Sequence, residues 1–162
     1  MKLPIHTIAD APDPAKPLLE AAKKKYNFVP NILAVMANEP PLLEAYMSLS
    51  SLFERSSLTP IERQLVLLTV SQANGCQYCM AAHSAMAMMA KVPEPHIAAV
   101  RNAGPTGDAK LDALLNYTRE MTNLRGNPSA AVSDRLAAAG YSTSQILAVV
   151  LAVGMKLSLI HI

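Results

Sequence analysis

Hydrophobic residues recur at helical spacing along most of the chain, and prolines and glycines separate the resulting segments. No stretch shows the alternation of apolar and polar residues that is typical of a half-buried strand. We therefore predict an all-α fold, a single compact domain over residues 1–162. The expected helices, with approximate bounds, are 14–26, 31–38, 41–55, 60–74, 76–91, 94–102, 108–124, 127–140 and one that opens at 142.

Several of these helices have recognisable starts and stops. Thr59 to Glu62 forms a capping box with proline at the first helical position, and Ser142 to Gln145 forms a second box. Asp13-Pro14 is read as an N-cap followed by proline. Asn74-Gly75 ends one helix just before the next begins.

Composition agrees with helices and limits the function. Aromatic residues make up 4% of the chain, with no tryptophan and nine methionines, and methionine is a better helix former than the aromatic residues. A net charge of +2 is too small to indicate a nucleic-acid or membrane partner. The longest apolar run, Ile146 to Met155, is too short to span a bilayer, so we expect it in the core or in a subunit contact. We expect no secretory leader and a cytoplasmic location.

The candidate chemistry lies in the helix expected from residue 76. Cys76 and Cys79, the two cysteines of the chain, are followed by His83. At 100° per residue the three side chains fall within an arc of about 60° on one helix face. Both cysteines lie in the first turn, where the helix dipole is expected to lower the pKa of a thiol. The spacing indicates thiol–disulfide chemistry, with His83 as the base for Cys79.

Other interpretations of the same residues remain open. Free cysteines are often small buried hydrophobic residues without chemistry. A structural zinc site needs four ligands, and the fourth would have to come from elsewhere in the chain; the candidates are His6, His96 and His161. Glu62 is interpreted as a capping residue rather than as part of a proton relay, and Tyr78 as a residue at the mouth of the site.

The residues from Leu58 to His83, with the Cys-Gln-Tyr-Cys segment, closely resemble the core of the carboxymuconolactone decarboxylase family, in particular its alkyl-hydroperoxidase D-like branch. We take 58–91 as the core motif. The resemblance implies a helical homo-oligomer, a trimer or a hexamer, with peroxidase or disulfide-reductase activity and no haem, metal or other cofactor. Cys79 would attack the hydroperoxide, Cys76 would close the disulfide, and His83 would relay protons. A dithiol, such as a lipoylated protein, would reduce the pair again.

The chain departs from that family pattern at two positions of the site, one of them Tyr78, where the family's peroxidase usually has His. The family's glutamate lies twelve residues before the first cysteine, and this position is Gln64 here. A glutamine can orient His83 or a water molecule but cannot carry a proton as a carboxylate does. We therefore predict an antioxidant thiol peroxidase with Cys79, Cys76, His83 and Gln64 in its site. The alternatives are a disulfide reductase or redox sensor with weak peroxidase activity, and a structural or zinc-binding helical module.

Overall fold

The computed structural model describes residues 3–159 and 162, and in this part of the chain the regular elements are all helices. The prediction of an all-helical fold is confirmed. In chain order the elements are a short 3-10 helix, η1 (Asp13–Ala15), and the α-helices α1 (Lys16–Tyr26), α2 (Asn31–Met36), α3 (Pro40–Glu54), α4 (Pro60–Ala73), α5 (Gln77–Met89), α6 (Glu94–Arg101), α7 (Ala109–Asn123), α8 (Ala130–Ala138) and α9 (Thr143–Leu157).

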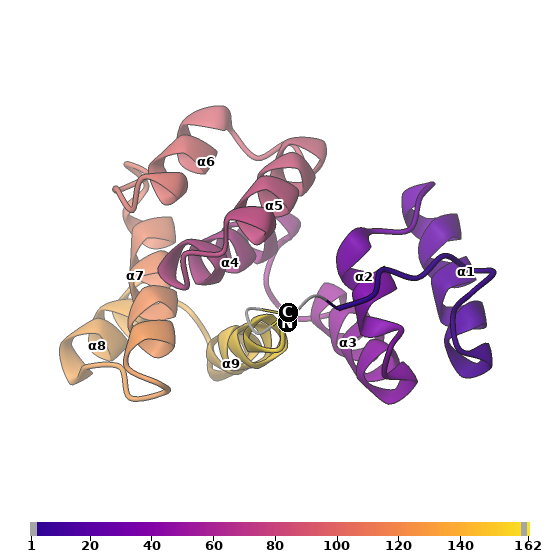
Figure 1. Cartoon of the computed structure of the whole chain (residues 1–162). Helices are drawn as coiled ribbons and strands as arrows, with labels where there is room; N and C mark the ends of the chain where they lie inside the picture. Colours follow the sequence, from indigo (N-terminus) through magenta and orange to yellow (C-terminus); the bar gives the residue numbers. More distant parts are fainter. Residues whose placement is uncertain (1–2, 160–161) are drawn as a thin grey trace. The chain divides into compact units, whose positions relative to one another are not determined.

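The described residues form two compact units. The first holds residues 3–52 and residue 162, with η1, α1, α2 and most of α3. The second holds residues 53–159, with the end of α3 and all of α4 to α9. Both units consist of helices joined by short turns (Figure 1). Every residue of the Cys-Gln-Tyr-Cys segment belongs to the second unit.

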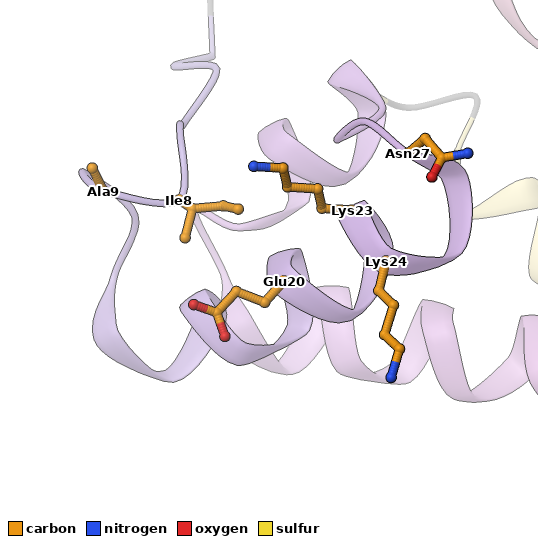
Figure 2. A pocket seen from close by; sticks show the side chains of 6 residues that line it. All are labelled: Ile8, Ala9, Glu20, Lys23, Lys24 and Asn27. Carbon is orange, nitrogen blue, oxygen red and sulfur yellow. The ribbon is translucent and has the colours of Figure 1, made fainter.

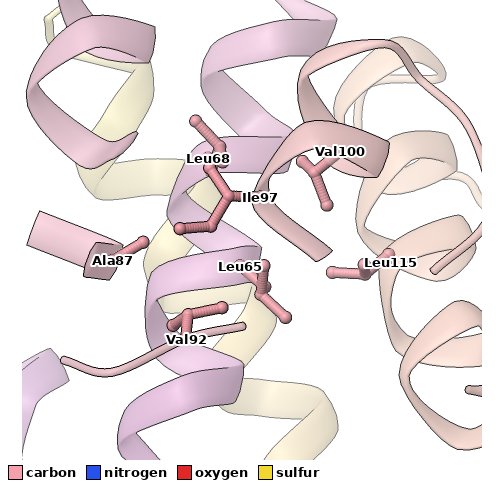
Figure 3. Packing of buried hydrophobic residues seen from close by; sticks show 7 residues of the cluster. All are labelled: Leu65, Leu68, Ala87, Val92, Ile97, Val100 and Leu115. Atoms are coloured by element: carbon pink, nitrogen blue, oxygen red, sulfur yellow. The ribbon is translucent and has the colours of Figure 1, made fainter. Parts of the chain in front are cut away.

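Helix α4 is the central element of the second unit. It packs against α5, α6, α7 and α9, and its stretch from Leu65 to Ser71 is buried at every position. Figure 3 shows part of the resulting core, in which α4 contributes Leu65 and Leu68 to a cluster with residues of its neighbours. The other buried members of that cluster are Ala87, Val92, Ile97, Val100 and Leu115. Burial of this apolar surface fixes α5 against α4 and so positions the cysteines.

Both predicted capping boxes are present. The Thr59 hydroxyl accepts a hydrogen bond from the Glu62 backbone N–H at 3.2 Å, and the Glu62 carboxylate accepts one from the Thr59 N–H at 2.8 Å. The same reciprocal pair forms between Ser142 and Gln145 at the start of α9. At the junction between α4 and α5, Gly75 has a φ of 64°, a left-handed conformation that favours glycine. That turn ends α4 and allows the chain to begin α5 directly.

Two predicted helix starts are wrong. Asp13 is not the N-cap of the first helix: Pro12 precedes η1, and the Asp13 carboxylate instead pairs with Lys16 Nζ at 2.7 Å. The helix expected from residue 127 begins at Ala130, because Ser129 caps it by accepting a hydrogen bond from the Val132 N–H. At the second of these starts, the Ser129 hydroxyl supplies a local cap that the proline position did not indicate.

Helix α9 has one buried and one exposed face. Its buried face includes Ala148, Ala152 and Lys156, which follow one another at four-residue intervals. Leu147 and Val150 lie on the other face and are 61% and 44% exposed. The apolar run is therefore part of the core on one side only. Within the residues that the structure describes, no helix is long and apolar enough to cross a membrane.

Candidate active site

Cys76 is the N-cap residue of α5. Its backbone is extended, and its sulfur accepts a hydrogen bond from the backbone N–H of Cys79 at 3.3 Å. The two thiols also interact with each other, and both cysteines are free. Cys76 is partly exposed, whereas Cys79 is buried with 3% of its surface exposed. The prediction that both cysteines lie in the first turn of a helix is confirmed.

The expected lowering of the thiol pKa at the helix start is not found for Cys79. Burial raises the pKa of Cys79, and its hydrogen bond to Cys76 raises it further. The positive charge of Lys156 acts in the opposite direction but does not outweigh burial. The helix start alone therefore does not make Cys79 a stable thiolate, since desolvation penalises the charged form.

Lys156 reaches the site from α9. Its side chain is 1% exposed, and its Nζ lies 3.0 Å from His83 Nε2. It is also coupled electrostatically to the Cys79 thiol, whose pKa its charge lowers against the larger effect of burial. Sequence reasoning missed this residue, which directly follows the apolar run Ile146 to Met155. The available signal was its position four residues after Ala152, on the apolar face of α9.

His83 is buried, with 7% of its surface exposed, and its described hydrogen bond is to Lys156. Burial, helped by the Lys156 charge, lowers the pKa of His83 to about 3, so the imidazole is neutral at ordinary pH. A lysine Nζ can donate to a neutral imidazole nitrogen, which places the ring proton on Nδ1. Nδ1 is buried and has no hydrogen-bond partner in the described part of the chain. The predicted proton exchange between His83 and Cys79 stays a prediction.

The residues of α4 separate into two roles. Gln64 has a buried Oε1 without a hydrogen-bond partner among the described residues, so it makes no hydrogen bond to His83 through that atom. Its part in a relay stays a prediction. Glu62 has the structural role expected of it, because its carboxylate caps α4 and also accepts a hydrogen bond from the Tyr141 hydroxyl at 2.8 Å.

The residues considered as metal ligands do not converge. Across residues 3–159 and 162, no group of three or more His, Cys, Asp and Glu side chains is arranged to hold a metal ion. His6 contacts Asn38 in the first unit, and His96 lies on α6. His161 lies outside the described residues. Tyr78 is 49% exposed beside the buried Cys79, as a residue at the mouth of a site would be.

A separate hollow of about 680 Å³ lies in the first unit. Figure 2 shows that it is lined by side chains from the N-terminal segment and from α1 and its end. Those residues are Ile8, Ala9, Glu20, Lys23, Lys24 and Asn27. None of these lining residues was predicted as a site residue from the sequence. The lining contains neither a cysteine nor a histidine. The cysteine pair and His83 lie in the second unit, away from this hollow's lining.

Comparison with known proteins identifies the family of the chain. The sequence pattern of the Carboxymuconolactone decarboxylase family matches residues 40–120, half of the 162-residue chain, including the whole Cys-Gln-Tyr-Cys segment. The chain belongs to the carboxymuconolactone decarboxylase family. The resemblance inferred from Leu58 to His83 is thus confirmed. No curated protein matches the chain significantly.

Several solved structures have the same fold as this carboxymuconolactone decarboxylase family member. An uncharacterized peroxidase-related protein from Silicibacter sp. TM1040 has a TM-score of 0.79 at 23% identity, covering 98% of this chain and 84% of its own. A peroxidase-related alkylhydroperoxidase AhpD core protein from Ralstonia eutropha JMP134 has a TM-score of 0.82 at 20% identity, over 94% and 83%. The debrominase Bmp8, in complex with 2,3,4-tribromopyrrole, has a TM-score of 0.81 at 18% identity, over 99% and 87%. The alkyl-hydroperoxidase D-like fold is thereby confirmed.

Proposed function

We propose that this protein is a thiol-dependent peroxidase that reduces hydroperoxides with the Cys76–Cys79 pair and is recycled by a dithiol. The observation that carries the proposal is the hydrogen bond from the Cys79 N–H to the Cys76 sulfur, because it holds two free thiols together at the start of α5. Such a pair can alternate between dithiol and disulfide without a cofactor. Membership of the family and the fold of its peroxidase-related relatives support the same function.

The reaction divides into three steps. The Cys79 thiolate attacks one peroxide oxygen, so that an S–O bond forms, the O–O bond breaks and the alcohol leaves with a proton. The Cys76 thiolate then attacks the sulfenic sulfur of Cys79, forming the disulfide and releasing the oxygen as water. An external dithiol, such as a dihydrolipoyl group on a partner protein, reduces the disulfide through a mixed-disulfide intermediate. The dithiol is oxidised, and the hydroperoxide becomes alcohol and water.

The two cysteines differ in exposure, which suits Cys79 to the first step and Cys76 to the second. Cys79 is 3% exposed and lies beside Lys156, in a place where a reactive sulfenic acid is shielded from further oxidation. Cys76 is more exposed, so the external dithiol can reach it once the disulfide has formed. The order of attack inferred from the family resemblance is therefore compatible with the exposure of the two sulfurs.

A steady-state assay tests this proposal. Cumene hydroperoxide with dihydrolipoamide should be turned over by the wild type and not by Cys79→Ser, while Gln77→Ser, a change at an exposed neighbouring position, should keep the activity. Turnover by Cys79→Ser at the wild-type rate would overturn the proposal. Because the fold relative Bmp8 is a debrominase, a brominated pyrrole belongs in the same assay, with bromide release as its readout.

A second candidate is a disulfide reductase with weak peroxidase activity. It is favoured by Gln64, whose buried Oε1 lacks a partner where the family resemblance leads one to expect a carboxylate. Reduction of a small disulfide by the prereduced protein, faster than its reaction with hydroperoxide at equal concentration, would favour this candidate. The reverse order of rates would favour the peroxidase.

A further inference from the structure

Lys156 has a buried amino group without a carboxylate partner among the described residues. The side chains that interact with its Nζ are His83 and Cys79, with a weaker Coulomb contribution from Cys76. A buried ammonium is costly unless it faces an anion or loses its proton. A cysteine next to it satisfies either condition, since it can become the anion or can donate its own proton to the amine.

We propose that Lys156 is the residue that exchanges a proton with Cys79, and that His83 holds Lys156 in place for this exchange. The inference rests on the proposed function in one respect, namely that Cys79 is the attacking sulfur. It assigns a catalytic role to a side chain of α9, 77 positions from the cysteine in the sequence. It also changes the role of His83 from the base for Cys79 to a positioning residue.

The environment of His83 makes it a poor base for this thiol. Its pKa lies at about 3, so it takes up a proton only in acid solution. Its Nε2 is already occupied by Lys156 at 3.0 Å, and the remaining nitrogen carries the ring proton when Nε2 accepts. The basic lone pair of the imidazole is therefore used to orient the amine rather than to receive the thiol proton.

The proton affinities of Cys79 and Lys156 are moved toward each other. Burial raises the pKa of the Cys79 thiol and lowers the pKa of the Lys156 ammonium. Groups with similar pKa values exchange a proton with little free-energy cost in either direction. The pair is thus suited both to form a thiolate and to return the proton afterwards.

The contacts of Nζ are compatible with both protonation states. As an amine, Lys156 donates to His83 Nε2 and accepts from the thiol of Cys79. As an ammonium, it donates to His83 and to the thiolate. The proton can therefore move between sulfur and nitrogen while the hydrogen bond to His83 persists, so no rearrangement of α5 against α9 is required.

In the first chemical step, Lys156 accepts a proton from Cys79 and then returns it to the leaving group. The Cys79 thiol transfers its proton to the Lys156 amine, and the resulting thiolate attacks the hydroperoxide. As the O–O bond breaks, the ammonium returns the proton to the leaving alkoxide, which departs as the alcohol. Cys79 is left as a sulfenic acid, and Lys156 is again an amine. Sulfur is oxidised, the peroxide is reduced, and no further reactant is needed.

The other charged side chains on the helices that pack against α9 have partners elsewhere. On α4, Glu62 is bound by Thr59 and Tyr141, and Arg63 donates to the carbonyls of Ser56 and Leu58. On α7, three charged side chains form hydrogen bonds to nearby residues: Asp112 with Thr106, Arg119 with Asn116, and Glu120 with Ser129. Lys110 of the same helix lies over the Tyr141 ring. The thiols and His83 are therefore the groups that decide how Lys156 titrates.

The test uses a Cys76→Ser background, in which Cys79 is the one remaining thiol of the chain. The rate of its alkylation by iodoacetamide is measured against pH, and this readout requires no hydroperoxide activity. Lys156→Met should slow alkylation at neutral pH by roughly 100-fold and move the midpoint of the profile to higher pH. Lys24→Met, which removes an exposed lysine, is the matched control and should leave the profile unchanged. A Lys156→Met profile equal to that of the control would overturn the assignment.

Two further variants separate a catalytic role from a structural one. Lys156→Arg keeps the charge but cannot release a proton at ordinary pH, so alkylation should stay near the parent rate. In the otherwise wild-type chain, Lys156→Arg should abolish the single-turnover reaction of the reduced protein with hydroperoxide. His83→Asn should lose less alkylation rate than Lys156→Met; if it alone abolished alkylation, His83 would be the base. If Lys156→Met does not fold, the contrast between the two assays of Lys156→Arg decides.

The outcome for Lys156 is separable from that for the proposed function. A wild type that does not reduce hydroperoxides, but whose alkylation depends on Lys156, would remove the peroxidase and keep the lysine assignment. A wild type that turns over hydroperoxide, with alkylation independent of Lys156, would do the reverse.

Discussion

The backbone N–H of Cys79 donates a hydrogen bond to the sulfur of Cys76, so the first cysteine of the pair is also the N-cap of α5. One side chain thus serves the stability of the helix and the chemistry of the site. The two contributions can be separated by substitution, because serine is a good N-cap and alanine is a poor one.

Cys76→Ser should keep the stability of the wild type, whereas Cys76→Ala should lower the free energy of unfolding by about 1 kcal/mol. Both variants should be unable to form the disulfide. Urea denaturation under reducing conditions measures the first effect, and thiol quantification after oxidation measures the second. Equal stability of the two variants would show that the sulfur does not cap α5.

Tyr141 and Glu62 connect the start of α9 to the start of α4. The Tyr141 hydroxyl donates to the Glu62 carboxylate at 2.8 Å in a buried position. Tyr141→Phe leaves a carboxylate oxygen without this donor, and we expect a loss of about 1–3 kcal/mol in the free energy of unfolding. Tyr78→Phe, at an exposed tyrosine, is the control and should change stability little. A loss of equal size in both variants would argue against the connection.

The stability of the protein should decrease as the pH is lowered through a window set by His83. Its pKa is lowered from 6.5 to about 3 by burial and by Lys156, so the unfolded chain binds a proton that the folded chain does not. The contribution of His83 to stability is complete above pH 6.5 and is lost progressively as the pH falls toward 3. The expected slope is roughly 1 kcal/mol per pH unit.

Denaturation of the wild type and of His83→Asn between pH 4.5 and 6.5 measures this slope. The variant should give a flatter curve in this window. Below pH 4.5, Glu62 adds to the loss: burial raises its pKa, but the hydrogen bonds from Thr59 and Tyr141 together lower it below 4.5. Parallel curves for the two proteins would mean that His83 is not the group responsible.

Gln64→Glu should raise the rate of hydroperoxide turnover, because it restores the carboxylate that the family resemblance implies at this position. The single-turnover rate of disulfide formation is the appropriate measurement. Gln72→Glu, a partly exposed glutamine on the same helix, is the control and should leave the rate unchanged. An unchanged rate in Gln64→Glu would count against a relay through this position.

The exposed face of α9 provides a test of assembly. Leu147 and Val150 are three residues apart and largely exposed, and Leu157 lies farther along the helix at 37% exposure. We propose that this face is covered in a homo-oligomer, since apolar residues at such spacing are typical of helix contacts. Light scattering should show an oligomer for the wild type and smaller species for Leu147→Glu. A monomeric wild type would remove this proposal.

Much of this fold could be predicted from local patterns. The boxes at Thr59 and Ser142 identified two helix starts because the interactions involved span only three residues. The position of Cys76 and Cys79 at a helix start followed from Gly75 in the same way. The start assigned to Asp13 failed because an equally local partner, Lys16, competes for its carboxylate.

The site was less predictable because its decisive contact is not local. Lys156 meets His83 only through the packing of α9 and α5 in the second unit, 73 positions apart in the sequence. The acidity of Cys79 was misjudged for the same reason: the helix start is visible in the sequence, but burial by other helices is not. Patterns within one helix thus identified the cysteines, and tertiary packing determined their environment.

The most direct test of the redox account is a mass measurement of the peptide that holds both cysteines. The reduced protein is treated with one equivalent of hydroperoxide and digested without a reductant. The mass of the Cys76–Cys79 peptide is then measured by mass spectrometry. The account predicts a loss of two hydrogen atoms by the pair, reversed by dihydrolipoamide, and one added oxygen on Cys79 in Cys76→Ser. Two free thiols of unchanged mass after complete exposure to hydroperoxide would contradict it.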